Sequence, residues 1–222
     1  MKGKIFLSGG GDKNQTFDID EIFLKDIKKI LYIPIAWKNE DYNSCLNWFM
    51  DMIKSHKHAV IEMCTDLTKK IELENYDAVY IGGGNTFKLL KKLKENKFDK
   101  KIIEYYLNGG IIYGGSAGAI IWGFDINISN LGKDSDKNEV NLIDKSGLNF
   151  VGGKDIQCHY EQDQLDELKR YSLKIKRDIL AIPEESAILI DDKNLKVIGN
   201  KPITLISKNN HILYYPNKII NI

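Results

Sequence analysis

The sequence IIYGGSAGAIIWG, residues 111–123, predicts a buried strand, a sharp turn and the first turn of a helix. Its residues Gly114, Ser116 and Gly118 fit the G-x-S-x-G pattern of a nucleophile elbow, in which a strained strand-to-helix turn exposes a serine Oγ at the carboxyl end of a sheet. The two glycines would leave room where strand and helix cross, and Ala117 would keep its backbone N–H open to a reacting oxygen. A glycine-rich turn in which Ser116 only caps the helix fits the same pattern.

Strands and helices alternate before this stretch. Short apolar runs predict strands over residues 4–8, 30–36, 59–64 and 78–81, and helical spacing of apolar residues predicts helices over 18–28, 39–55, 86–93 and 99–108. Strands that are apolar throughout and alternate with helices are typical of a mainly parallel sheet covered by helices on both faces. We therefore expect the α/β fold class.

The pattern changes after the serine turn. Polar residues predict a loop over 134–140, and a strand over 156–160, a helix over 165–176 and a strand over 179–182 follow. The remaining residues alternate short apolar runs with turn sequences, as β-hairpins do. We expect a β-hairpin-rich, antiparallel C-terminal edge. Since no linker-like segment divides residues 1–222, we expect a single domain.

Composition narrows the function classes. The chain has 43% hydrophobic and 28% charged residues, as soluble globular proteins do. Its 32 Lys and Arg nearly balance 31 Asp and Glu, and no basic run is interleaved with aromatic residues, so we expect no nucleic-acid partner. Lys91, Lys92 and Lys94 are interpreted as the solvated face of a helix. Without a long apolar stretch or a signal-like N-terminus, we expect no membrane contact and a cytoplasmic location.

Cysteines and histidines form no metal-ligand pattern. Cys45, Cys64 and Cys158 are widely spaced and odd in number, which predicts reduced, mostly buried thiols rather than a disulfide framework or a zinc site. The histidines form no ligand cluster, and we interpret three of them as exposed loop residues: His56, His58 and His211. We expect neither a metal nor a cofactor.

Two triple-glycine loops, residues 9–11 and 82–84, follow predicted strands. Neither matches a phosphate-binding loop or the dinucleotide fingerprint, so nucleotide binding is disfavoured. A backbone N–H of Gly83 or Gly84 would instead converge with that of Ala117 as an oxyanion hole. Asn85 or Thr86 would cap the following helix.

A serine hydroxyl needs a base, and a basic imidazole needs a carboxylate. His159 ends a predicted strand and is the candidate base, although a purely structural histidine fits its sequence equally well. Glu184 follows an apolar run at another predicted strand end and is the first candidate for the carboxylate. Asp155, Glu161 and Asp163 lie near His159 in sequence and remain alternatives.

Taken together, these residues resemble peptidase E and its cyanophycinase relatives, which are serine peptidases with a class I glutamine amidotransferase-like fold. The resemblance spans roughly residues 2–190. It rests on four segments in the family's order: Ile81-Gly82-Gly83-Gly84-Asn85-Thr86-Phe87, Gly115-Ser116-Ala117-Gly118-Ala119, His159-Tyr160 and Pro183-Glu184.

The resemblance implies that Ser116 is the nucleophile, His159 the general base and Glu184 the orienting acid of a peptidase that acts through an acyl-enzyme. The order Ser, His, Glu differs from that of the α/β-hydrolases. We expect a small peptide as substrate and a monomer or homodimer. The alternatives are an isopeptide or ester hydrolase and an inactive small-molecule binding or regulatory protein on the same fold.

Family members typically cleave after an acidic residue, and in the aspartyl dipeptidases arginines downstream of the histidine bind the substrate carboxylate. Here residues 161–170 begin acidic, and their only cations are Lys169 and Arg170. This departure argues against strict specificity for aspartyl dipeptides. We expect Asn85, Tyr160 and Arg170 to contact the substrate.

Overall fold

A computed structural model describes residues 2–39, 41–54, 59–132, 135–192 and 194–220. Its strands are β1 (Lys4–Ser8), β2 (Lys29–Ile33), β3 (Val60–Met63), β4 (Ala78–Ile81), β5 (Ile111–Gly115), β6 (Asp155–Gln157), β7 (Ile179–Ala181), β8 (Ser186–Asp191), β9 (Asn194–Gly199), β10 (Ile203–Ser207), β11 (Asn210–Tyr214) and β12 (Ile219–Ile220). The α-helices are α1 (Phe17–Leu24), α2 (Tyr42–Met52), α3 (Thr86–Glu95), α4 (Phe98–Leu107), α5 (Ala117–Ile120) and α6 (Leu165–Ile175). Short 3₁₀ helices are η1 (Leu73–Asn75), η2 (Ile126–Asn130) and η3 (Gln162–Gln164).

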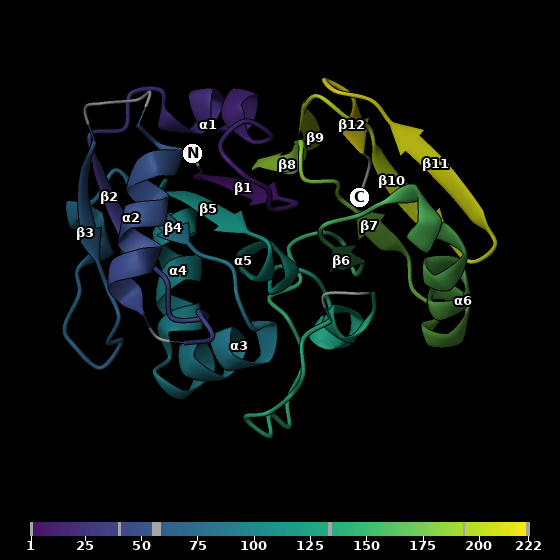
Figure 1. Cartoon of the computed structure of the whole chain (residues 1–222), viewed down its shortest axis with the longest axis horizontal. Coiled ribbons are helices and arrows are strands. Elements are labelled where there is room, and N and C mark those ends of the chain that lie inside the picture. The colour runs from purple at the N-terminus through teal and green to yellow at the C-terminus, as the bar shows by residue number, and fades with distance from the viewer. Residues whose placement is uncertain (1, 40, 55–58, 133–134, 193, 221–222) are drawn as a thin grey trace.

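In the described residues the strands form two sheets (Figure 1). The larger has the order β12-β9-β8-β1-β5-β4-β2-β3, in which β1, β5, β4, β2 and β3 are parallel. On the other side of β1 the strands are antiparallel: β8 pairs with β1, β9 with β8 and β12 with β9. The carboxyl ends of the parallel strands lie at one edge, where Leu7 and Ile81 both pair with Gly114. The predicted α/β class with an antiparallel edge is confirmed.

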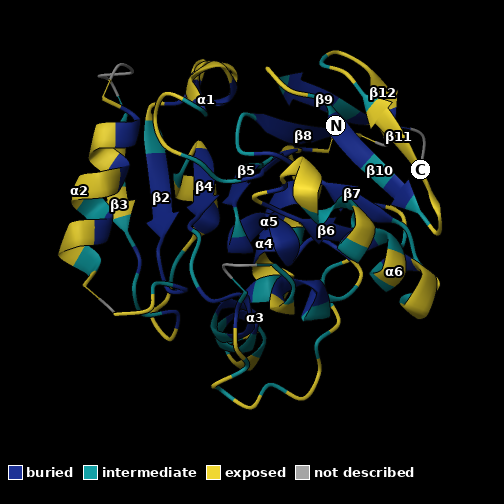
Figure 2. Cartoon of the chain, turned by 45° about the vertical axis from the view of Figure 1, so that its right-hand side comes forward, coloured by how far each residue is buried: buried dark blue, intermediate teal, exposed yellow. Residues whose placement is uncertain are grey.

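Helices cover both faces of the larger sheet because side chains alternate along each apolar strand. On one face, aromatic strand residues including Tyr32, Tyr80 and Tyr113 pack with α1 and α2. On the other, aliphatic residues such as Leu7 and Ile81 pack with α3, α4 and α5. Figure 2 shows these strands buried between partly exposed helices.

The second sheet, β11-β10-β7-β6, corrects the prediction of one sheet with a hairpin-rich edge. β8 and β9 form that edge, but β10 pairs with β7, and the strand predicted over 156–160 is β6, which also belongs to the smaller sheet. Alternating apolar residues predict a hairpin but do not define which sheet it joins. The two sheets share a core, since Ile203 and Ile206 belong to the same apolar cluster as Ile5.

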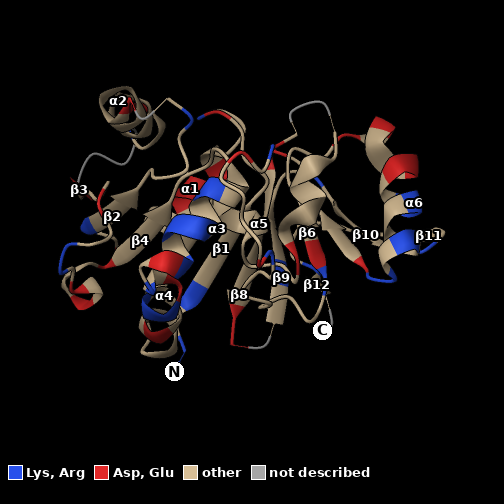
Figure 3. Ribbon diagram, turned by 90° about the horizontal axis from the view of Figure 1, so that it is seen from below, with Lys and Arg blue, Asp and Glu red and all other residues tan. Residues whose placement is uncertain are grey.

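The lysines of α3 correct a second prediction. Lys91 Nζ donates to the Val140 carbonyl at 2.8 Å, and Lys94 Nζ contacts Asp144 Oδ2 at 2.6 Å and the Ser146 carbonyl at 2.7 Å. These side chains hold the irregular segment 135–150 against α3, so they are not simply solvated. Figure 3 shows basic and acidic groups interspersed over the molecule.

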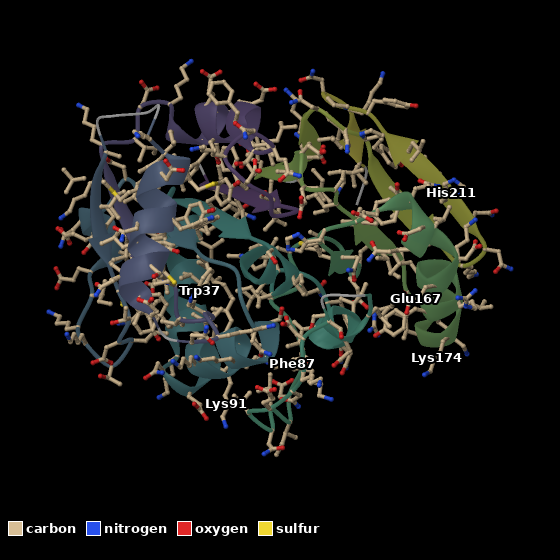
Figure 4. The ribbon with its side chains drawn as sticks, in the orientation of Figure 1. Trp37, Phe87, Lys91, Glu167, Lys174 and His211 are labelled. Atoms are coloured by element: carbon tan, nitrogen blue, oxygen red, sulfur yellow. The ribbon has the colours of Figure 1, made fainter. Side chains whose placement is uncertain are left out.

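Among the described residues, no helix combines the length and hydropathy needed to cross a bilayer. Cys45, Cys64 and Cys158 are buried free thiols, as predicted. His211 is exposed, as predicted, but it lies on strand β11 rather than in a loop, and it is distant from the carboxyl edge of the parallel strands (Figure 4). His56 and His58 lie outside the described residues.

Candidate active site

Ser116 lies between β5 and α5, where the sequence predicts a sharp turn. Its backbone has φ 52° and ψ −114°, a conformation that non-glycine residues rarely adopt. A Cβ atom on Gly114 would lie 2.2 Å from the Gly118 carbonyl oxygen, and one on Gly118 would lie 2.3 Å from the carbonyl oxygen of Ile81. The prediction that strand and helix cross where only glycine fits is therefore confirmed.

Two hydrogen bonds join Ser116, His159 and Glu184. Ser116 Oγ lies 2.8 Å from His159 Nε2, and His159 Nδ1 lies 2.7 Å from Glu184 Oε1. A neutral imidazole that carries its proton on Nδ1 donates to the carboxylate and accepts from the serine hydroxyl. The arrangement can therefore withdraw a proton from Ser116 Oγ as this oxygen attacks an electrophile.

Different elements supply the three side chains. Ser116 follows a strand of the larger sheet, His159 follows β6 of the smaller one, and Glu184 lies on the connection between β7 and β8. The backbone N–H of His159 donates to the Gly9 carbonyl at 2.9 Å. A Cβ atom on Gly10 would lie 2.2 Å from His159 Cε1, so this glycine lets the loop after β1 pack directly on the imidazole.

Gln15 is a site residue that sequence reasoning missed. Its Nε2 donates to Glu184 Oε2 at 2.6 Å, while its Oε1 accepts from the backbone N–H of Asp12 at 2.8 Å. Both carboxylate oxygens of Glu184 are thus held, one by Gln15 and one by His159. No local pattern could identify Gln15, because it lies in a polar loop 169 residues from its partner.

The alternative carboxylates have other partners or positions. Asp155 is fully buried, pairs with Arg177 at 3.2 Å and accepts from the backbone N–H of Asp125. Burial raises the pKa of Asp155, and the Arg177 guanidinium opposes that rise. Glu161 takes part in the capping box of η3, and Asp163 is exposed within η3. The structure brings Glu184, and none of these three carboxylates, to His159 Nδ1.

Backbone N–H groups lie close to the serine. A Cβ atom on Gly83 would be 3.2 Å from Ser116 Cβ, so the loop after β4 packs against this side chain. No hydrogen bond within the described part of the chain uses the N–H of Gly83, Gly84 or Ala117. These three N–H groups therefore have no hydrogen-bond partner among the described residues.

A cavity of about 530 Å³ opens beside Ser116, His159 and Glu184. Of the three residues expected to contact substrate, Tyr160 lines this cavity, whereas Asn85 and Arg170 are not among its described lining residues. Asn85 caps α3 by accepting from the Lys88 N–H and donates to the Lys137 carbonyl. Arg170 is exposed on α6. The cations in the described lining are instead Lys38 and Lys201, which sequence reasoning did not single out.

Comparison with known proteins gives consistent matches. The profile of peptidase family S51 matches residues 5–198. Peptidase E of Actinobacillus pleuropneumoniae is 24% identical over 94% of this chain and 94% of its own length. A solved structure of a candidate peptidase E protein from Listeria monocytogenes is 26% identical, covers 90% of this chain and 99% of its own, and gives a TM-score of 0.70. A peptidase structure from an acI-B1 actinobacterium is 16% identical, covers 100% and 98%, gives a TM-score of 0.73 and supports the fold alone.

The fold, the serine at its strand-to-helix turn and these relatives define a hydrolase of the serine peptidase class. The profile match extends over most of the sequence. The chain belongs to peptidase family S51, and the resemblance to peptidase E is confirmed. The comparison to the class I glutamine amidotransferase fold stays a prediction.

Proposed function

We propose that this serine peptidase hydrolyses small peptides through Ser116, His159 and Glu184. Ser116 Oγ attacks the scissile carbonyl while His159 Nε2 takes the hydroxyl proton, and Glu184 stabilises the resulting imidazolium. His159 then gives the proton to the leaving amine, which leaves an acyl-enzyme on Ser116. Water, activated by the same imidazole, releases the acyl group and restores the enzyme.

The observation that carries this proposal is the continuous pair of hydrogen bonds, 2.8 Å and 2.7 Å long, from Ser116 Oγ to Glu184 Oε1. The N–H groups of Ala117 and of Gly83 or Gly84, which have no partner among the described residues, support a second step of the proposal. They would donate to the carbonyl oxygen as it becomes negative, a contribution typically worth about 3 to 4 kcal/mol per donor.

The charges of the cavity bear on substrate choice. In its described lining, four carboxylates face two lysines: Asp136, Glu161, Glu184, Glu185, Lys38 and Lys201. Lys201 and Glu185 pair with each other at 2.6 Å, which leaves three carboxylates and one lysine in the described lining. An acidic substrate side chain would meet mostly like charge, whereas the free ammonium group of a short peptide would meet opposite charge. We therefore propose short peptides with a free amino terminus, without a requirement for an acidic residue.

The first test is intact-protein mass spectrometry after treatment with a small fluorophosphonate. We expect one adduct on the wild-type protein and none on Ser116→Ala or His159→Ala, because the hydroxyl reacts only when the imidazole activates it. In dipeptide hydrolysis, both variants should lower kcat/KM by roughly a thousand-fold or more.

Ser129→Ala is the matched control, since Ser129 lines the same cavity but donates to the Ile126 carbonyl. This variant should label and hydrolyse as the wild type does. An adduct that persists in Ser116→Ala would contradict the proposed nucleophile. A kcat/KM for Asp-Ala far above that for Ala-Ala would contradict the proposed indifference to an acidic residue.

A further inference from the structure

A second cavity, of about 210 Å³, reaches Ser116 and His159 as well. It shares Gly84, Ser116 and His159 with the larger cavity, so both open onto the same two reactive side chains. Ligand pockets usually measure about 300 to 1,000 Å³, and the second cavity is therefore sized for one side chain rather than for a whole ligand.

The lining of this cavity is chemically unlike that of the larger one. Its large side chains are aromatic or thioether groups: Tyr32, Trp37, Trp48, Met52, Tyr80 and Tyr113. The remaining lining residues are Gly, Ser, Thr and His159, and no Asp, Glu, Lys or Arg belongs to its described lining. An anionic group placed here would lose hydration without gaining an ion pair, whereas an apolar group would gain burial.

The tyrosines of this cavity are fixed by packing. Tyr80 stacks on Tyr113 with ring centroids 4.5 Å apart, and Tyr32 stacks on Phe49 of α2 at 4.3 Å. The side chain of Trp37, labelled in Figure 4, packs against the same apolar cluster, and its backbone carbonyl accepts from Lys88 Nζ at 2.9 Å. Since these groups are preorganised, a bound side chain would not have to order them.

We propose that the aromatic cavity is a specificity subsite that takes one large uncharged apolar side chain, aromatic or aliphatic, next to the scissile bond. This inference rests on the proposed function, because it places the peptide across Ser116. Each cavity would then bind a different part of the substrate. The apolar side chain would occupy the aromatic cavity, between α2 and the serine, and the charged amino terminus would occupy the carboxylate-lined cavity.

Trp48→Ala tests the subsite. Trp48 lies on α2, is 39% exposed and lines the cavity, so its removal opens one wall while the buried core stays intact. On the wild type, either Phe-Ala or Ala-Phe should be hydrolysed with a kcat/KM at least about ten-fold above that of Ala-Ala. In Trp48→Ala the ratio of kcat/KM for the preferred phenylalanine dipeptide to that for Ala-Ala should fall by roughly ten-fold.

The pair of dipeptides also shows on which side of the bond the cavity acts. A preference confined to Phe-Ala places the apolar side chain in the acyl group, and one confined to Ala-Phe places it in the leaving group. Met50→Ala is the matched control, because Met50 lies on the same helix, is 49% exposed and does not line the cavity. Trp48→Leu, which keeps an apolar wall, should retain part of the preference.

A binding experiment separates failure of the subsite from failure of the peptidase reaction. Phenylalaninamide and the α-amide of aspartic acid, both with a free amino group, are titrated into Ser116→Ala protein, with and without Trp48→Ala, and followed by NMR. We expect the phenylalanine compound to bind at least ten-fold more tightly, and we expect Trp48→Ala to remove that difference. Equal binding of both compounds, or a preference unaffected by Trp48→Ala, overturns the subsite even if Ser116 labels and Ala-Ala is hydrolysed. Absence of the Ser116 adduct overturns the proposed function. The titration would still show whether the cavity prefers an apolar side chain.

Discussion

The carboxylate of Glu184 is held at both oxygens, and Gln15 provides the contact that the imidazole does not. An amide that donates to the second oxygen fixes the rotation of the carboxylate and thereby the plane of the imidazole. Gln15 is in turn oriented by the backbone N–H of Asp12. We infer that Gln15 is a positioning residue for the proposed reaction.

Gln15→Ala should lower kcat by roughly ten- to hundred-fold and change KM less, because Glu184 loses its second anchor while the other residues that line the cavity with Gln15 remain. Steady-state kinetics on a dipeptide measures both constants. Asn14→Ala is the matched control, as the backbone N–H of Asn14, not its side chain, takes part in the loop's hydrogen bonds. A Gln15→Ala effect confined to KM would show that this residue contacts the substrate instead.

Residues at this scale differ in how far a sequence can identify them. Ser116 is marked by its immediate neighbours, because the close approach of Gly114 and Gly118 leaves a local pattern. His159 and Glu184 have no such mark; their places at predicted strand ends made them candidates, and the family resemblance strengthened that choice over the alternatives. Gln15 and Lys201 could not be predicted, since what brings each to the cavity is the packing of loops distant in sequence.

At the scale of elements, α1 carries a buried acid. Asp20 is 4% exposed and accepts from Thr16 Oγ1 at 2.7 Å. Desolvation raises the pKa of Asp20 from 3.8 to about 7, and the hydrogen bonds from Thr16 and Tyr113 oppose that rise. Folding therefore places a carboxyl group where its charged form is disfavoured.

Asp20 should make the protein less stable as pH rises. Below about pH 4 this carboxyl is protonated in both folded and unfolded states, and between about pH 4 and 7 the unfolded state releases the proton first. The free energy of unfolding should thus fall by up to about 4 kcal/mol from Asp20 alone over this range. Asp20→Asn should remove this dependence and be more stable than the wild type at pH 8.

Urea unfolding at pH 5 and pH 8 measures the difference. Glu21→Gln, a change at an exposed residue of the same helix α1, is the control and should follow the wild type. Equal stabilities of Asp20→Asn and wild type at pH 8 would contradict a buried, costly carboxylate.

Elements were predictable where the pattern is local and uncertain where pairing is distant. The apolar runs gave β1, β4 and β5 within a residue or so, whereas the helix predicted over 18–28 ends at Leu24 and the strand predicted over 30–36 ends at Ile33. Pro34 directly follows β2 and lacks the backbone N–H that would continue the hydrogen bonding of this strand. The assignment of β10 to the second sheet depends on β7, which no local signal connects to it.

On the scale of the whole molecule, the candidate site is assembled where two sheets meet. Ser116 follows the larger sheet and His159 the smaller one, and one apolar cluster includes residues of both, among them Ile5 and Ile203. Because this core is continuous, neither sheet can separate without exposing buried apolar area.

Loss of activity and loss of secondary structure should therefore coincide during urea unfolding. Dipeptide hydrolysis and far-UV circular dichroism, followed on the same samples, should give the same midpoint. Activity lost at a clearly lower urea concentration, with most of the dichroism retained, would show that the smaller sheet separates first. The single-domain prediction for residues 1–222 depends on this result.

The backbone of Ser116 has φ 52° and ψ −114°. A substitution that relieves this conformation should raise the melting temperature of the protein but abolish its turnover. Strain of this kind typically costs about 1 to 3 kcal/mol, and glycine relieves it whereas alanine does not. Ser116→Gly should thus melt at a higher temperature than Ser116→Ala in differential scanning calorimetry, although both lack the hydroxyl; equal melting temperatures would contradict the strain. A laboratory evolution campaign that selects survivors of heating alone would accordingly enrich dead enzymes at this codon, so each round must also be screened for turnover.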